Sequence, residues 1–159
     1  MRRKDREVTA AHEKEAILDR CLSGHLSMCA NGQPYGVTLN FGWEKEESGA
    51  YVLWFHCAAE GRKVEILKAN PSVWFFAERE GQFREGRNAA GQTYMTMTYE
   101  SVAGEGQVTF VDGLDEKRHG LGVLCARFTE TPVSVIPDAV IAQTCVFKVV
   151  VPNLSAKRH

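Results

Sequence analysis

The sequence predicts a mainly β protein, an antiparallel barrel decorated by a few helices. Apolar and polar residues alternate with a period of two from Pro34 to Trp43, which is the pattern of a strand with one buried face. Asn31-Gly32 is a strong hairpin signal, because both residue types tolerate positive φ. Helical patterns separate only some of the predicted strands, so the regular alternation of a doubly wound parallel sheet is absent.

The composition is that of one globular domain, and we expect residues 1–159 to fold as a unit. The chain is 44% hydrophobic and 25% charged, close to the averages for globular proteins. A net charge of −1 offers no general basic field for nucleic acid, and the basic clusters Met1–Lys4 and Ala156–His159 are expected to be solvated. No apolar run approaches the roughly 20 residues of a membrane span or resembles a secretory signal. The five cysteines include no C-x-x-C pair, which favours reduced thiols in a cytoplasmic protein without a metal site.

The N-terminal part begins with a helix predicted over Ala10–Leu22. Thr9 can cap this helix, Gly24 can end it, and its apolar residues share one face. A strand over His25–Ala30 follows and leads into the hairpin turn.

The strand after this turn has two different faces. Its apolar face carries Tyr35, Val37, Leu39, Phe41 and Trp43. Its other face carries Gly36, Thr38, Asn40 and Gly42. The strand Ala50–His56 returns after a polar loop and is apolar on both sides, so we expect both of its faces to be covered.

The second half of the chain mixes strands with two further helices. The elements are predicted, in order, as a helix over Glu60–Ala69, a strand over Ser72–Arg79, a loop over Gly81–Gly91, strands over Thr93–Tyr99 and Val102–Val111, a helix over Leu114–Phe128 and a strand over Thr144–Pro152. Asn70-Pro71 stops the first of these helices. Gly104 and Gly106 predict a bulge or bend in their strand.

The connection between His56 and the following helix carries the most chemical information. Gly61-Arg62-Lys63 stands at the helix start, where free backbone N–H groups and the positive end of the helix dipole lie. Glycine lets the backbone approach an anion, Arg62 offers a planar fork to a phosphate, and Lys63 adds a mobile charge. A bound dianion would offset the cost of two cations in one turn. The alternative is a solvated helix end that happens to be basic.

A wider resemblance supports the phosphate site. The segments PYGVTLNFGW and YVLWFHCAAEGRKVEILKANP resemble the 5-nitroimidazole-resistance (Nim) proteins of the pyridoxamine-phosphate-oxidase-like superfamily. The similarity extends to REVT…AILDRCLSGHLSM and to YESVAGEGQVTFV. The resemblance implies an FMN-binding split β-barrel that works as a homodimer, with two flavins at the subunit interface. The segment 79–92 matches no pattern of the family.

The resemblance also implies a set of site residues. The FMN phosphate would be bound by Gly61, Arg62 and Lys63. The flavin ring and ribityl chain would contact Val37, Thr38, Leu39 and Asn40, while Tyr99, Ser101 and Val102 would pack against the flavin or the partner subunit. From the pattern alone, the polar face with Thr38 and Asn40 more simply meets solvent.

His56 has two interpretations. In some Nim-type proteins the histidine at this position lies near the flavin and is implicated in chemistry, and a histidine can donate a proton near neutral pH. Otherwise His56 hydrogen-bonds a loop carbonyl and is structural.

Three hypotheses for the function follow. The first is an FMN-dependent oxidoreductase, in which a reductant charges the flavin and a small acceptor, such as a nitro compound or a quinone, takes the electrons. The second is a carrier or sensor of flavin or haem without turnover, in which His56 or His25 could be an axial ligand. The third is a barrel that has lost its cofactor.

Overall fold

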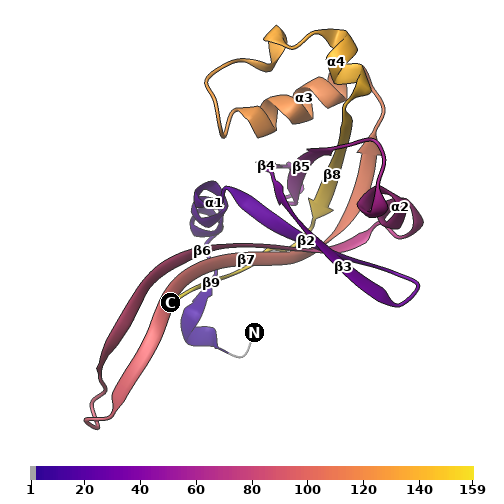
Figure 1. Ribbon diagram of the computed structural model, residues 1–159. Coiled ribbons are helices and arrows are strands. Elements are labelled where there is room, and N and C mark those ends of the chain that lie inside the picture. Colours follow the sequence, from indigo (N-terminus) through magenta and orange to yellow (C-terminus); the bar gives the residue numbers. More distant parts are fainter. Residues whose placement is uncertain (1–2) are drawn as a thin grey trace.

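The computed structural model describes residues 3–159, which form a nine-stranded antiparallel sheet with helices around it (Figure 1). In chain order the elements are η1 (Lys4–Arg6), β1 (Glu7–Val8), α1 (Ala11–Arg20), β2 (Ser23–Ala30), β3 (Gln33–Asn40), β4 (Gly42–Lys45), β5 (Tyr51–Cys57), α2 (Arg62–Ala69), β6 (Ser72–Arg87), β7 (Thr93–Val111), α3 (Leu114–Cys125), η2 (Val133–Val135), α4 (Asp138–Gln143), β8 (Cys145–Val151) and β9 (Ser155–Arg158). The strands run in the order β3-β2-β6-β7-β8-β5-β4, and β9 joins β1 to β7. The predicted antiparallel architecture is confirmed.

The strand β5 is covered on both faces, as its sequence predicted. Leu53 and Phe55 point into the barrel and belong to the main core. Val52 and Trp54 point outward into a second core under α3 and α4. A Cβ at Gly120 of α3 would lie 2.2 Å from a ring carbon of Trp54, so only glycine allows α3 to approach this closely.

The long strand predicted from Pro34 to Trp43 is interrupted at Phe41. The chain turns there from β3, which pairs with β2, to β4, which pairs with β5. The Phe41 side chain is fully buried and packs against the rings of Phe55 and Phe75. Because β3 and β4 are the two ends of the sheet order, this corner is where the sheet curls back on itself.

The loop predicted over Gly81–Gly91 is instead part of a long hairpin. The strands β6 and β7 stay paired from the barrel out to Arg87 and Thr93, and Figure 1 shows this hairpin extending away from the rest of the molecule. We call residues 79–99 the arm. Its polar and glycine residues suggested a loop, but each strand of the arm satisfies the backbone of the other.

The predicted bulge lies elsewhere than expected. The register between β6 and β7 shifts between Glu80 and Phe83, whereas it is regular at Gly104 and Gly106. A Cβ at Gly104 would lie 2.5 Å from Val151 Cγ1, so close packing across the barrel explains that glycine.

The helix ends differ from those predicted. The α1 N-cap is Ala10 and makes no side-chain hydrogen bond, so Thr9 does not cap the helix. The helix ends at Arg20 with Cys21 as its C-cap, while Gly24 lies in β2. The helix α3 ends at Cys125, before Phe128. Short elements with weak patterns, α4 and β9, were not predicted.

The C-terminal basic cluster is part of the fold. Residues Ser155–Arg158 form β9, so their backbone is paired rather than freely solvated. Of the N-terminal cluster, Met1 and Arg2 lie outside the described residues. Within residues 3–159, no helix has the length and apolar character needed to cross a membrane, and no group of three metal-binding side chains is found.

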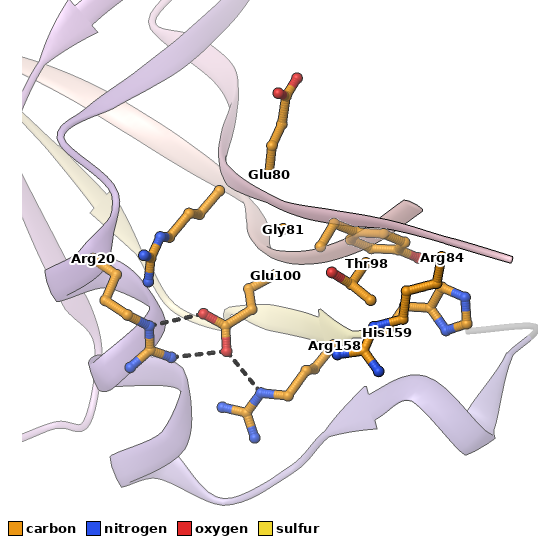
Figure 2. A pocket seen from close by; sticks show the side chains of 10 residues that line it. Arg20, Glu80, Gly81, Arg84, Thr98, Glu100, Arg158 and His159 are labelled. Atoms are coloured by element: carbon orange, nitrogen blue, oxygen red, sulfur yellow. Dashed lines mark hydrogen bonds and ion pairs between the residues drawn. The ribbon is translucent and has the colours of Figure 1, made fainter. Parts of the chain in front are cut away.

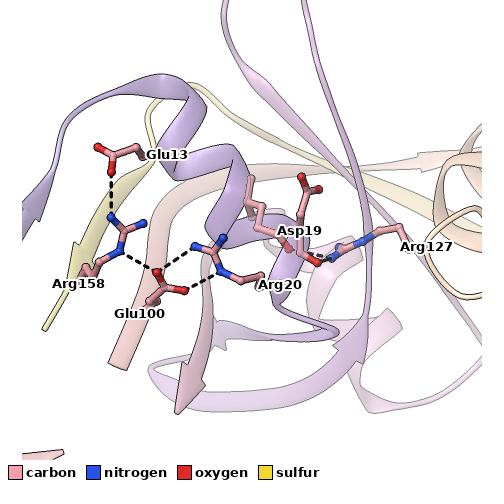
Figure 3. Close-up of polar contacts among 7 residues, drawn as sticks. Glu13, Asp19, Arg20, Glu100, Arg127 and Arg158 are labelled. Atoms are coloured by element: carbon pink, nitrogen blue, oxygen red, sulfur yellow. Dashed lines mark hydrogen bonds and ion pairs between the residues drawn. The ribbon is translucent and has the colours of Figure 1, made fainter. Parts of the chain in front are cut away.

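An ion network ties α1 and β9 to β7 (Figure 3). Both oxygens of Glu100 accept hydrogen bonds from Arg20, at 2.7 and 2.9 Å, and Arg158 Nε donates to one of them at 2.7 Å. Arg158 also reaches Glu13 of α1, at 2.9 Å. One carboxylate on β7 therefore holds two neighbouring elements in place.

Replacing Glu100 with Gln is expected to lower the free energy of unfolding at pH 7 by about 1–3 kcal/mol. Burial raises the pKa of Glu100, but the hydrogen bonds from Arg20 and Arg158 outweigh it and leave the pKa below its ordinary value of 4.5. A carboxylate whose pKa is lower in the folded than in the unfolded chain stabilises the fold at pH values above its unfolded pKa. This contribution is lost as the pH falls through its pKa in the folded chain.

Urea unfolding at pH 7 and pH 3 tests this prediction, since the difference between the parent and Glu100→Gln should shrink at the lower pH. Glu116→Gln, which removes the exposed pair with Lys148, is the control and should change stability little. If Glu100→Gln is less stable than the parent by the same free energy at both pH values, the loss does not come from the charge of this carboxylate.

Candidate functional site

The start of α2 is an open, electropositive helix end. Gly61 is its N-cap, with a φ of 128°, and no atom lies within 4 Å of where a Cβ would stand. The first helical hydrogen bonds run from the N–H groups of Val64 and Glu65 to the Gly61 carbonyl. The N–H groups of Arg62 and Lys63 therefore precede the helical ladder and are available to an anion.

Two cations flank this helix end. The Arg62 guanidinium is exposed and lies 4.8 Å from the centre of the Tyr35 ring on β3. Lys63 follows Arg62 in the first turn of α2 and is half-buried. Burial and the neighbouring Cys145 raise the pKa of Cys57, at the end of β5, to about 11, and the charge of Lys63 opposes that rise. An open glycine, free amides and two cations fit a phosphate dianion.

A flat polar and aromatic surface covers the outer face of the neighbouring strands. Thr38, His25, Phe76 and Ala103 lie in register across β3, β2, β6 and β7. Thr38 Oγ1 lies 3.1 Å from His25 Nδ1, and the His25 and Phe76 rings stack at 6.0 Å with an angle of 29°. Four adjacent strands span roughly 14 Å, which is enough for a flat aromatic ring system.

The residues predicted on β3 divide between its two faces. Val37 and Leu39 pack against the barrel core, so only their backbone is open to a ligand. Thr38 and Asn40 are exposed on the outer side, and Asn40 Nδ2 donates to the Leu22 carbonyl at 2.9 Å, which fixes the junction between α1 and β2.

The residues predicted on β7 lie apart from α2 within one chain. Val102 is buried in the core, Ser101 is 8% exposed, and the Tyr99 ring lies 6.0 Å from that of His159. The strand order puts β2 and β6 between β7 and β3. One chain therefore does not bring Tyr99 and Ser101 to the start of α2.

His56 is the second-last residue of β5 and lies on the outward side of the strand, with Val52 and Trp54. Its side chain is exposed and makes no hydrogen bond to any residue of 3–159. The pairing of β4 with β5 would set Asn40 opposite His56 if it continued, but the chain leaves this pairing at Phe41. His56 therefore stands where β3 and β5 separate, and the structure offers no support for a bond to a loop carbonyl.

The outer surface with His25 and Phe76 was not predicted as a site. His25 was expected only as a possible haem ligand, and no role at a ligand site was predicted for Phe76. In the structure Phe75 is buried, whereas Trp74 is 44% exposed. The alternation within Ser72–Ala77 is hidden because aromatic residues occupy both faces.

The chain matches the family described as pyridoxamine 5'-phosphate oxidase over residues 10–158. No curated protein matches it. A candidate 5-nitroimidazole antibiotic resistance protein from Bacteroides thetaiotaomicron VPI-5482 has a similar structure, with 25% sequence identity, a TM-score of 0.80, and 96% of this chain and 86% of that chain covered. These matches confirm the resemblance and the split-barrel fold expected from the sequence.

Two further solved structures share the fold. One is a FAD-binding protein from Mesorhizobium loti, with 21% identity, a TM-score of 0.64, and 95% of this chain and 96% of that chain covered. The other is a FAD- and haem-binding protein from Mycobacterium smegmatis, with 16% identity, a TM-score of 0.80, and 96% of this chain and 73% of that chain covered.

Proposed function

This chain belongs to the pyridoxamine 5'-phosphate oxidase family, and from that premise we propose that it is a flavoprotein that binds FMN. The observation that carries the proposal is the open helix end at Gly61, with Arg62 and Lys63 beside it. These residues would hold the phosphate. Thr38 and Asn40, with the backbone between them, would line the ribityl chain and the flavin ring.

We further propose that the protein is an oxidoreductase. Bound FMN supplies transfer of electrons from a reductant to a small acceptor, such as a nitro compound or a quinone. The protein would bind and orient the flavin, and the exposed imidazole of His56 would supply a proton to the reduced acceptor. Two structural relatives are named as FAD-binding or FAD- and haem-binding proteins, and the Bacteroides protein is named for 5-nitroimidazole resistance, which supports this chemistry.

A haem carrier is the second candidate, because the His25 ring lies on the outer surface with only Nδ1 engaged. The absorption spectrum of the purified protein separates the two, followed by mass identification of the released cofactor. Flavin bands and the mass of FMN are expected. A Soret band would favour haem, and the absence of both from protein refolded with excess FMN would overturn the proposal.

His56→Gln is expected to lower the rate of acceptor reduction by roughly 10²-fold or more while leaving the flavin spectrum near normal. The reason is that the His56 side chain is exposed and makes no hydrogen bond to any residue of 3–159, so its replacement should not disturb the loop.

Stopped-flow reoxidation of pre-reduced protein by a nitroaromatic compound measures this step without donor binding. His12→Gln, at an exposed helix position, is a matched control. If His56→Gln is reoxidised at the parental rate across the pH range, His56 does not donate the proton.

A homodimer is the assembly we propose for this site. Phe83, Met95 and Met97 are 59, 68 and 46% exposed, and all three lie on the side of the arm that continues the outer surface of β6 and β7. An exposed apolar face of this length is typical of a protein–protein interface. A second copy would cover it and bring its own Tyr99 and Ser101 toward the first copy's flavin.

Replacing Phe83 and Met97 with Glu is expected to give a monomer that retains less flavin, because the two side chains face each other across the arm and their charges would oppose burial. Light scattering and the flavin-to-protein ratio measure the outcome. Val135→Glu, at an exposed apolar residue outside the arm, is the control and should remain dimeric. A parent protein that is monomeric at micromolar concentration with FMN bound would contradict the proposal.

A further inference from the structure

Two adjoining cavities lie along the arm. One has a volume of about 430 Å³ and is lined by Arg20, Arg79, Arg84 and Arg158. The other, of about 580 Å³, is lined by Arg6, Tyr94 and Met95. Arg84, Thr98 and His159 line both, so the two cavities are direct neighbours. Figure 2 shows Arg20 and Arg158 on either side of Glu100, and Arg84 beside His159.

The side chains of the first cavity carry an excess of positive charge. Glu100 is shared between Arg20 and Arg158, so one carboxylate faces two guanidinium groups. The side chains of Arg79 and Arg84 make no hydrogen bond or ion pair with any residue of 3–159, although their backbones pair within the arm. Glu80 is the other carboxylate in the lining, and Glu13 pairs with Arg158 from α1. Four arginines therefore face three carboxylates, and Arg6 of the second cavity adds a further cation, which leaves an excess of positive charge for an anion.

The second cavity contains a donor without an acceptor. Arg6 Nε is buried and has no hydrogen-bond partner within residues 3–159. Arg6 Nη2 lies 3.0 Å from His159 Nε2, and Thr96 Oγ1 lies 2.8 Å from the same nitrogen. Since arginine can only donate, Nε2 is the acceptor, and in the neutral ring the proton of His159 is on Nδ1. A buried donor of this kind needs an acceptor that the described chain does not supply.

We infer that this arginine-lined space binds the pyrophosphate group of a nucleotide. Guanidinium forks match phosphate oxygens in pairs, and arginines on both sides of the space can hold two linked phosphates. The ring of Tyr94 provides a surface on which an attached base can stack. The site is separate from the phosphate position at α2. A role for this nucleotide as the reductant that charges the flavin rests on the proposed function, whereas binding of the nucleotide at this site does not.

Isothermal titration calorimetry of the purified protein with its cofactor tests this inference. The probes are inorganic pyrophosphate, ADP and NADPH, with nicotinamide riboside as a probe without phosphate. Arg79→Ala with Arg84→Ala is the test variant, because neither side chain has an ion-pair partner in the described chain. Arg87→Ala is the matched control on the same arm, where Arg87 binds only the Gly91 carbonyl, at 3.2 Å.

The double variant is expected to bind pyrophosphate and both nucleotides at least tenfold more weakly, with an unchanged flavin spectrum, whereas Arg87→Ala should match the parent. If the double variant does not fold, the single variants Arg79→Gln and Arg84→Gln should each show part of the loss. Tighter binding of ADP and NADPH than of pyrophosphate supports a nucleotide, and equal binding of the three reduces the site to one for free anions. No binding by the parent, or binding unchanged in the double variant, overturns the inference. If the parent binds pyrophosphate but not flavin, the proposed function is contradicted while the pyrophosphate site is supported.

Discussion

Replacing Arg127 with alanine is expected to lower the free energy of unfolding by about 3–5 kcal/mol, since hydrogen bonds from a charged group contribute about 1.5–3 kcal/mol each and are not fully additive. Arg127 Nη2 donates to the carbonyls of Leu18 and Cys21, each at 2.7 Å. Arg127 Nη1 donates to the Phe41 carbonyl at 2.9 Å, and the guanidinium lies 4.5 Å from the centre of the Phe41 ring.

These bonds join three parts of the chain at one point. The Leu18 carbonyl otherwise accepts only a 3.2 Å bond from the Cys21 N–H, so a cation at this helix end strengthens the cap and opposes the helix dipole. The same side chain fixes the corner at Phe41, where the sheet curls back on itself. Figure 3 shows Arg127 reaching the end of α1. Without Arg127, the carbonyls at this junction would lose the charged donor that they share.

Urea unfolding followed by circular dichroism measures the loss. Arg127→Lys should recover only part of it, because one ammonium group cannot span both sets of carbonyls. Arg118→Ala is the control, since it removes an ion pair with Asp138, whose side chain is 70% exposed, and should cost less than about 1 kcal/mol. A change for Arg127→Ala as small as that of the control would show that the corner holds without this residue.

Local patterns were enough to predict the strands of the barrel. The alternation before Phe41 and the double-sided apolar run of β5 are set by burial within a few residues. The Asn31-Gly32 turn is likewise local, with φ values of 52° and 73°. The role of Arg127 could not be predicted in this way, because its partners lie 86 to 109 residues away and no local pattern marks them.

The β6 half of the arm and β9 were missed for a related physical reason, whereas the strand over Thr93–Tyr99 was predicted. The residues 81–87 are exposed except for the half-buried Gly86, and one side of β9 is open, so burial leaves no apolar alternation to detect in these segments. The pairing that makes them strands comes from a distant segment, as when Lys157 stands opposite both Glu7 and Ser101. The Glu100 network was missed because it depends on that pairing.

The candidate site likewise has one part that could be predicted from the sequence and one part that could not. Gly61, Arg62 and Lys63 adjoin in sequence, so the helix end could be predicted and the structure places a helix there. The surface of Thr38, His25 and Phe76 joins three strands, and only their register shows that these side chains share a face. Their contact with a flavin stays a prediction.

Replacing both Arg62 and Lys63 with alanine is expected to weaken FMN binding by roughly 10²- to 10⁴-fold. Two charge-assisted hydrogen bonds contribute about 1.5–3 kcal/mol each, and each 1.4 kcal/mol is a factor of about ten in Kd. The loss should be confined to the phosphate, so the double variant should bind riboflavin as well as the parent does. Fluorescence quenching titrations of the apoprotein with FMN and with riboflavin measure both values.

Lys68→Ala is the matched control, because it removes a cation from the far end of the same helix, where Lys68 lies 5.8 Å from the Phe110 ring centre. It should leave the affinity for FMN near that of the parent. Raising the salt concentration should weaken FMN binding to the parent and to Lys68→Ala alike, and should have little effect on the double variant. If the parent binds FMN and riboflavin equally well, the phosphate does not bind at α2, and the open helix end at Gly61 is a solvated terminus.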